Sequence, residues 1–106
     1  MATGRLAATA LSATTIADIY SPAASTQATV SVVVTNRNAS DVTVRLAISA
    51  TTVTQANGEF IEYEATVKQG KPLVWTGIVL SASDILTAYS SAANVDVVVW
   101  GIEETA

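Results

Sequence analysis

Carboxylates are the side chains of this sequence that could do chemistry, and several of them lie close together along the chain. The acidic residues that could act as a group are Glu59, Glu62, Glu64, Asp41 and Asp96. Glu62 and Glu64 would share one face of a β-strand, with side chains about 7 Å apart. Two carboxylates at this spacing could serve glycoside hydrolysis or bind a hard cation. A calcium loop would instead concentrate Asp and Asn ligands in one turn, so the pattern favours a solvated strand face with Lys68 nearby.

Other catalytic groups are missing from the sequence. It contains no cysteine and no histidine, which excludes Cys and His nucleophiles, Ser-His-Asp triads and thiolate zinc sites. The serines and threonines have no activating base, and the glycines are too isolated to form a phosphate-binding loop. Aromatic residues could form a sugar-stacking platform, but most lie on the apolar side of their strands, which favours the core. These residues are Tyr20, Tyr63, Tyr89, Trp75 and Trp100. We expect no enzymatic activity and no cofactor.

The composition restricts the partners of the chain. Charged residues make up 13% of the sequence and hydrophobic residues 50%, whereas soluble domains usually contain about 25% charged residues. We therefore expect part of the surface to be buried against other subunits. The net charge of −4 argues against a nucleic-acid partner, because phosphate binding needs clustered Lys and Arg. No apolar run approaches the roughly 18 residues of a membrane span, and residues 1–5 do not begin a signal-peptide pattern. We expect no membrane partner.

The stretch from Gln27 to Ala50 organises the elements that must position these residues. Apolar and polar side chains alternate with a period of two in both of its halves, on either side of the polar segment 36–40. A helix would scatter the apolar side chains around its circumference. The β-branched residues between Thr29 and Thr35 also favour an extended backbone. We therefore predict a β-hairpin whose turn is the segment 36–40.

Further strand patterns follow the same period. They lie at residues 14–20, 60–67, 73–80, 85–89 and 94–103. In the second of these, the alternation places Tyr63 on the apolar face and Glu62 and Glu64 on the other. Residues 73–80 are almost continuously apolar, which predicts a strand covered on both faces.

Seven or eight short strands and no helix predict an all-β fold. The expected architecture is an antiparallel β-sandwich of two sheets, either Ig-like or jelly-roll-like. Residues 14–106 would form this single domain. Residues 1–13 are short of large apolar side chains, so they are expected to form an N-terminal arm or an edge strand.

The last strand carries a candidate interface. If Val95, Val97 and Val99 fill the core, then Val98, Trp100 and Ile102 face outward, because successive side chains alternate; a reversed register or a bulge would place them inside. An outward Trp is typical of interface centres. The N-terminal segment adds possible anchors. The predicted interface residues are Arg5, Leu6, Leu11, Val98, Trp100 and Ile102.

Two stretches resemble a group of small virion proteins of tailed bacteriophages. The first runs from VTNR at 34–37 to FIEY at 60–63. The second is TGIVLSASD at 76–84, continued by SAANVDV at 91–97 and GIEE at 101–104. Members of this group resemble one another from about the first full strand to the C-terminus, so the resemblance covers most of the chain.

This resemblance implies a β-sandwich repeated many times on a phage head or tail. Such proteins are described as decoration, cement, tail or fibre components, and the group has no catalytic motif. We therefore expect a capsid decoration or cement subunit that acts as a homo-oligomer, possibly a trimer, on the major capsid protein or other virion proteins. Its location would be the virion, assembled in the host cytoplasm. The alternatives are a tail, baseplate or fibre accessory, or a carbohydrate-binding adhesion module.

Overall fold

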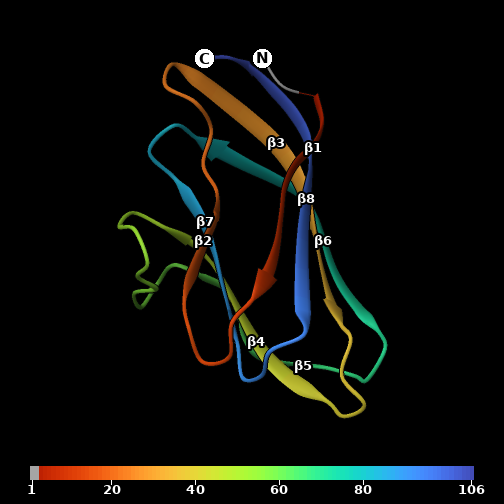
Figure 1. The fold of residues 1–106 in the computed structure, drawn as a ribbon. Helices are drawn as coiled ribbons and strands as arrows, with labels where there is room; N and C mark the ends of the chain where they lie inside the picture. The colour runs from red at the N-terminus through yellow and green to blue at the C-terminus, as the bar shows by residue number, and fades with distance from the viewer. Residues whose placement is uncertain (1–2) are drawn as a thin grey trace.

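The computed structural model describes residues 3–106, which form eight β-strands and no helix. The strands are β1 (Thr3–Leu11), β2 (Ala17–Tyr20), β3 (Thr26–Asn36), β4 (Val42–Ser49), β5 (Phe60–Val67), β6 (Pro72–Ser81), β7 (Ile85–Ser90) and β8 (Val95–Thr105). They build two antiparallel sheets of four, with the orders β1-β8-β3-β6 and β2-β7-β4-β5. Figure 1 shows these sheets as two packed layers. The predicted all-β sandwich is confirmed.

The strand order is that of a jelly roll with eight strands. Strands pair from the ends of the chain inward, β1 with β8, β2 with β7, β3 with β6 and β4 with β5. The whole chain is thus one long hairpin whose tip lies between β4 and β5. Two further pairings, β3 with β8 and β4 with β7, fold this long hairpin into two layers. Pairing therefore joins distant residues, such as Gly4 with Gly101.

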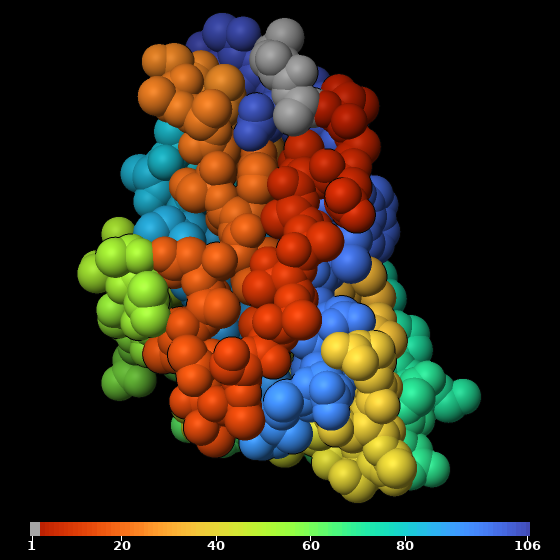
Figure 2. All heavy atoms as spheres, in the orientation of Figure 1, coloured from red at the N-terminus to blue at the C-terminus, as the bar shows by residue number. Residues whose placement is uncertain are grey.

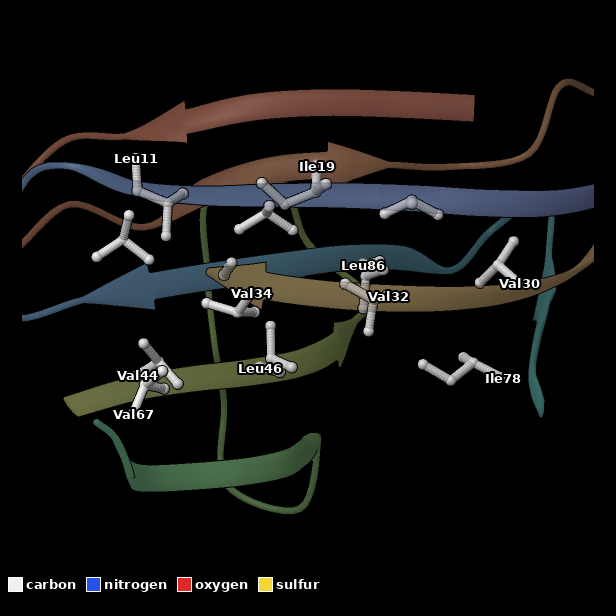
Figure 3. Packing of buried hydrophobic residues seen from close by; sticks show 14 of the residues in the cluster. Leu11, Ile19, Val30, Val32, Val34, Val44, Leu46, Val67, Ile78 and Leu86 are labelled. Carbon is white, nitrogen blue, oxygen red and sulfur yellow. The ribbon is translucent and has the colours of Figure 1, made fainter. Parts of the chain in front are cut away.

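The core lies between the two sheets and is built mainly from valine and leucine. β3 contributes Val30, Val32 and Val34, and β4 contributes Val44 and Leu46, all at most 1% exposed. Figure 3 shows these side chains pointing into the space between the layers. The period-two pattern of both strands is therefore explained by one buried face on each, which is what alternation predicts.

The predicted hairpin between the two halves of 27–50 is wrong. β3 and β4 lie in different sheets, and segment 37–41 crosses from one layer to the other. Both strands have a buried valine face, and these faces pack against each other across the core instead of forming one sheet. The crossover is held by Asn36, whose buried side chain donates to the carbonyls of Ser40 at 2.8 Å and Val67 at 3.0 Å. Asn36 Oδ1 accepts from the backbone N–H of Asn38 at 2.8 Å.

The prediction for residues 73–80 is also wrong. β6 is an edge strand, not a strand covered on both faces, and Val74 and Val79 are exposed. Its register shifts by one residue around Thr76 and Gly77. Trp75 lies opposite the buried Val32 and donates from Nε1 to the Glu62 carboxylate on β5 at 2.8 Å. Because Trp75 and Glu62 join the edge strands of the two sheets, they close one open side of the sandwich.

The N-terminal segment is part of the sandwich from residue 3 onward. β1 is an edge strand that pairs with β8 from Thr3 to Leu11, and residues 1–2 lie outside the described residues. Leu11 is 4% exposed and belongs to the core. The first full strand predicted at 14–20 is shorter, because β2 begins at Ala17. β1 begins and β8 ends at the same end of the molecule (Figure 1).

The tip of the long hairpin is the segment 50–59 between β4 and β5. In Figure 2 it projects beside β2 at the side of the molecule. Asp18 of β2 fixes this segment by accepting hydrogen bonds from the Thr52 hydroxyl and the Val53 backbone N–H. Glu59 closes it from the other end, because its carboxylate accepts from the backbone N–H groups of Ala50 and Ala56.

Candidate assembly interface

The outer side of β8 exposes large apolar side chains. Val95, Val97 and Val99 are 0% exposed, which confirms the predicted register of the last strand. Trp100 is 39% exposed and Ile102 48% exposed on the opposite face. The exposed part of the Trp100 indole can still be buried against another molecule, so Trp100 is a natural centre for a contact.

Cross-strand neighbours extend this surface over the whole sheet. Val98 lies between Ala8 of β1 and Val33 of β3, and Val33 is in turn paired with Val74 of β6. Ile102 is paired with Thr29, which is paired with the exposed Val79. We call this surface the outer apolar face. It comprises Arg5, Ala8, Thr29, Ser31, Val33, Val74, Val79, Val98, Trp100 and Ile102.

Charges lie at the two ends of the outer apolar face and leave its centre neutral. At one end Arg37 forms an ion pair with Asp96 at 2.8 Å. At the other end Arg5 is exposed and paired in register with Trp100. Arg5 takes part in no ion pair within residues 3–106. The face therefore combines an apolar centre with separated charges of opposite sign.

The face is hollowed between β1 and β8. The hollow has a volume of about 240 Å³. Its lining residues are Ala8, Thr9, Ala10, Asp96, Val97 and Val98. It exists because Ala8 and Ala10 leave room where larger side chains would fill the surface. Its volume lies below the roughly 300–1,000 Å³ of ordinary small-molecule pockets, so it suits a single large side chain.

Four of the six predicted interface residues gather on the outer apolar face. They are Arg5, Val98, Trp100 and Ile102. Leu6 packs partly buried against the core, and Leu11 is fully inside it, so neither faces outward. Sequence reasoning missed Val74 and Val79, because the continuous apolar run of β6 was interpreted as covered on both faces. Ala8 carries no sequence signal, since an alanine on a strand fits either face.

The acidic residues are separated by the fold. Glu62 accepts from Trp75, Glu64 pairs with Arg45 and Asp96 pairs with Arg37. Asp41 accepts from the backbone N–H of Gln69 and pairs with Lys68 at 3.4 Å. Lys68 therefore neutralises Asp41 and not the carboxylates of β5. Within residues 3–106 no three acidic side chains come together as a metal site.

The predicted placement of Tyr63 is wrong, and a local backbone feature explains it. Tyr63 is 61% exposed, because β5 bulges opposite Arg45 and Glu64 adopts a φ of +51°. The Arg45 guanidinium lies 5.0 Å from the Tyr63 ring centroid and 4.5 Å from that of Tyr89. Its 2.6 Å bond to Glu64 holds the pKa of that carboxyl below its usual range. This cluster ties three strands together through cation–π contacts.

Tyr20 links β2 to the end of β8. Its hydroxyl donates to the Glu103 carboxylate. Burial raises the pKa of Tyr20 well above its usual value, and the hydrogen bond to Glu103 and the charge of Glu103 raise it further. The pKa of Tyr20 is higher in the folded chain than in the unfolded chain. The contribution of neutral Tyr20 to the free energy of unfolding is therefore fully present below about pH 10, the usual Tyr pKa, and is lost as the pH rises further.

Tyr20→Phe should therefore flatten the alkaline stability profile. Between about pH 10 and 12 the free energy of unfolding of the wild type is expected to fall more steeply than that of the variant. Urea titrations of the wild type and of Tyr20→Phe at several pH values measure this difference. Parallel profiles for wild type and Tyr20→Phe would contradict the role of the Tyr20–Glu103 bond.

No helix in residues 3–106 is long and apolar enough to cross a membrane. No protein-family model, curated protein or solved structure matches the chain.

Proposed function

We propose that this chain is a non-enzymatic structural protein of a bacteriophage virion. In this proposal it is a capsid decoration or cement subunit that acts as a homo-oligomer on the major capsid protein. The observation that carries the assembly role is the outer apolar face, with Trp100, Ile102, Val74 and Val79 exposed on one sheet. Contiguous apolar surface of this kind marks sites of protein interaction.

The mechanism of such a subunit is burial of surface. About 1,000 Å² of apolar area removed from water is worth about 25 kcal/mol before the costs of association. Stabilising a shell in this way needs no reactive side chain, which agrees with carboxylates that are each engaged by a separate partner. The resemblance of residues 34–63 and 76–104 to phage virion proteins supplies the viral context.

The jelly-roll fold is compatible with the proposed function but does not distinguish it from other functions. Viral capsid proteins and lectins both use this arrangement, and one fold serves many functions. A lectin would need free aromatic faces beside polar groups. Tyr63 and Tyr89 instead direct ring faces to Arg45, which is already paired with Glu64. The cluster therefore favours a structural role over a sugar platform.

Analysis of the particles tests the function directly. Mass spectrometry of virions purified from the phage that encodes the chain should detect it at high copy number, and antibody labelling in electron microscopy should place it on the heads. Label on the tails would favour the accessory alternative instead. A chain absent from purified virions, or one that binds a glycan array selectively, would overturn the proposal.

A further inference from the structure

We infer that the outer apolar face packs against the same face of a second copy of this chain. The two copies are related by a two-fold axis, and Trp100 of each fills the hollow over Ala8 and Ala10 of the other. This inference rests on the proposed assembly role and adds the partner and the geometry of the contact. Three observations carry it: the area of the face, its hollow beside the projecting Trp100, and its charges.

The area of the face meets the requirement of a stable contact. Four strands about 4.8 Å apart and about 30 Å long cover about 600 Å². Two such faces packed together would bury about 1,200 Å², which is the lower limit of ordinary specific interfaces. Sheets pack face to face in this way inside β-sandwiches, about 10 Å apart. A pair of copies would therefore form a stack of four sheets.

The face carries both a projection and a hollow. Trp100 projects from β8, while the alanines of β1 leave the hollow of about 240 Å³ beside Val98. Consider an axis that crosses the strands along the row of Ala8, Val98 and Val33, which are neighbours in register. Trp100 and Asp96 lie two residues from Val98 in opposite directions along β8. Rotation by 180° about the axis therefore places Trp100 of one copy opposite Asp96 of the second copy. The indole then lies over that copy's hollow.

The charges agree with the same axis. Arg5 is level with Trp100 on the neighbouring strand, so the rotation brings it close to Asp96 of the second copy. Arg5 forms no ion pair within residues 3–106, whereas Asp96 is partly exposed beside Arg37. The pairing therefore gives Arg5 an acidic neighbour that it shares with Arg37 of the second copy, and it leaves the centre of the contact neutral. Rim charges of this kind add orientation more than affinity.

The shape of the contact gives a dimer. A face that binds its own copy is isologous and closes with two-fold symmetry, whereas a trimer needs two different complementary patches. The projection and the hollow lie on one face, so each copy supplies one of each and the same contact occurs twice in the dimer. The possible trimer expected from the resemblance would instead need a second surface.

Analytical ultracentrifugation of the full chain measures the association. The wild type should sediment at twice the 10.9 kDa mass of the chain. Trp100→Ala should weaken the dimer by about 30-fold or more, as expected for a central Trp. Trp75→Ala is the matched control, because Trp75 is equally exposed but lies at the sandwich edge bonded to Glu62. Ala8→Phe should fill the hollow and also abolish the dimer.

A second measurement keeps every native side chain of the core and of the hollow. The chain has no cysteine, so Val33→Cys introduces a single thiol close to the proposed axis. A short bismaleimide should then link two copies into a covalent dimer at low protein concentration. Val53→Cys, on the exposed segment 50–59, should dimerise without forming a covalent dimer under the same conditions.

The outcomes separate this inference from the proposed function. A wild-type monomer at millimolar concentration, or a dimer unaffected by both Trp100→Ala and Ala8→Phe, overturns the inference. If such a chain is still found on virions, the proposed function stands and the face binds another virion protein. If the chain dimerises as described but is absent from virions, the inference stands and the proposed function fails.

Discussion

Replacing Asn36 with leucine should lower the free energy of unfolding by about 3 kcal/mol, although the two side chains are similar in size. Asn36 is 0% exposed and its amide satisfies the carbonyls of Ser40 and Val67. Its oxygen accepts from the backbone N–H of Asn38. Leucine would leave these groups without their partner, and each buried unsatisfied group costs about 1–3 kcal/mol. Urea denaturation followed by circular dichroism measures the loss.

Asn38→Ala is the control for this prediction. Asn38 lies on the same crossover and also donates from its side chain to Asn36 and Ala93, but the latter bond is exposed. Loss of the Asn38 side chain should cost about 0.5–1.5 kcal/mol for each of the two bonds, and Asn36 Oδ1 keeps the backbone N–H of Asn38 as a donor, so the total should stay below that of Asn36→Leu. Equal losses for Asn36→Leu and Asn38→Ala would show that Asn36 has no special part in holding β3 and β4 in separate sheets.

Replacing Gly101 with alanine should cost about 3 kcal/mol, which is the upper range for overpacking a well-packed site. An added Cβ would lie 2.1 Å from the carbonyl oxygen of Thr29 and 2.8 Å from the Cα of Val30. Both atoms belong to the backbone of β3, a central strand paired on both sides. They cannot yield like a flexible side chain, so β8 must shift away from β3.

Gly77→Ala separates this clash from backbone strain. Gly77 has a φ of +71°, but nothing lies within 4 Å of its would-be Cβ. Alanine there should cost only the roughly 1–2 kcal/mol of a left-handed L-residue. Because Gly101 lies between Trp100 and Ile102, Gly101→Ala should also weaken self-association. A Gly101 variant as stable as Gly77→Ala would contradict the close approach of β8 to β3.

The grouping of the β8 side chains into two faces followed from the sequence, and the structure decided which face is buried. Val95, Val97 and Val99 alternate with Asp96, Val98 and Trp100, and successive side chains of any strand point to opposite faces. Burial of one set therefore exposes the other, wherever the strand lies in the fold. The same argument failed at Tyr63, because one residue with positive φ at Glu64 reverses the alternation. The alternation of residues 60–67 in the sequence does not predict that bulge.

The sequence by itself determined that this chain is all-β, where most strands lie and which side chains of the last strand share a face. These are local consequences of a two-residue period and of β-branched side chains. Tertiary structure alone decided that β3 and β4 lie in opposite sheets and that β6 is an edge. It also brought Ala8 beside Val98, across some ninety residues of chain. The physical reason is that the two-residue period of side chains depends only on the local backbone of a strand. Which strands pair with it depends on how the whole chain packs around one core.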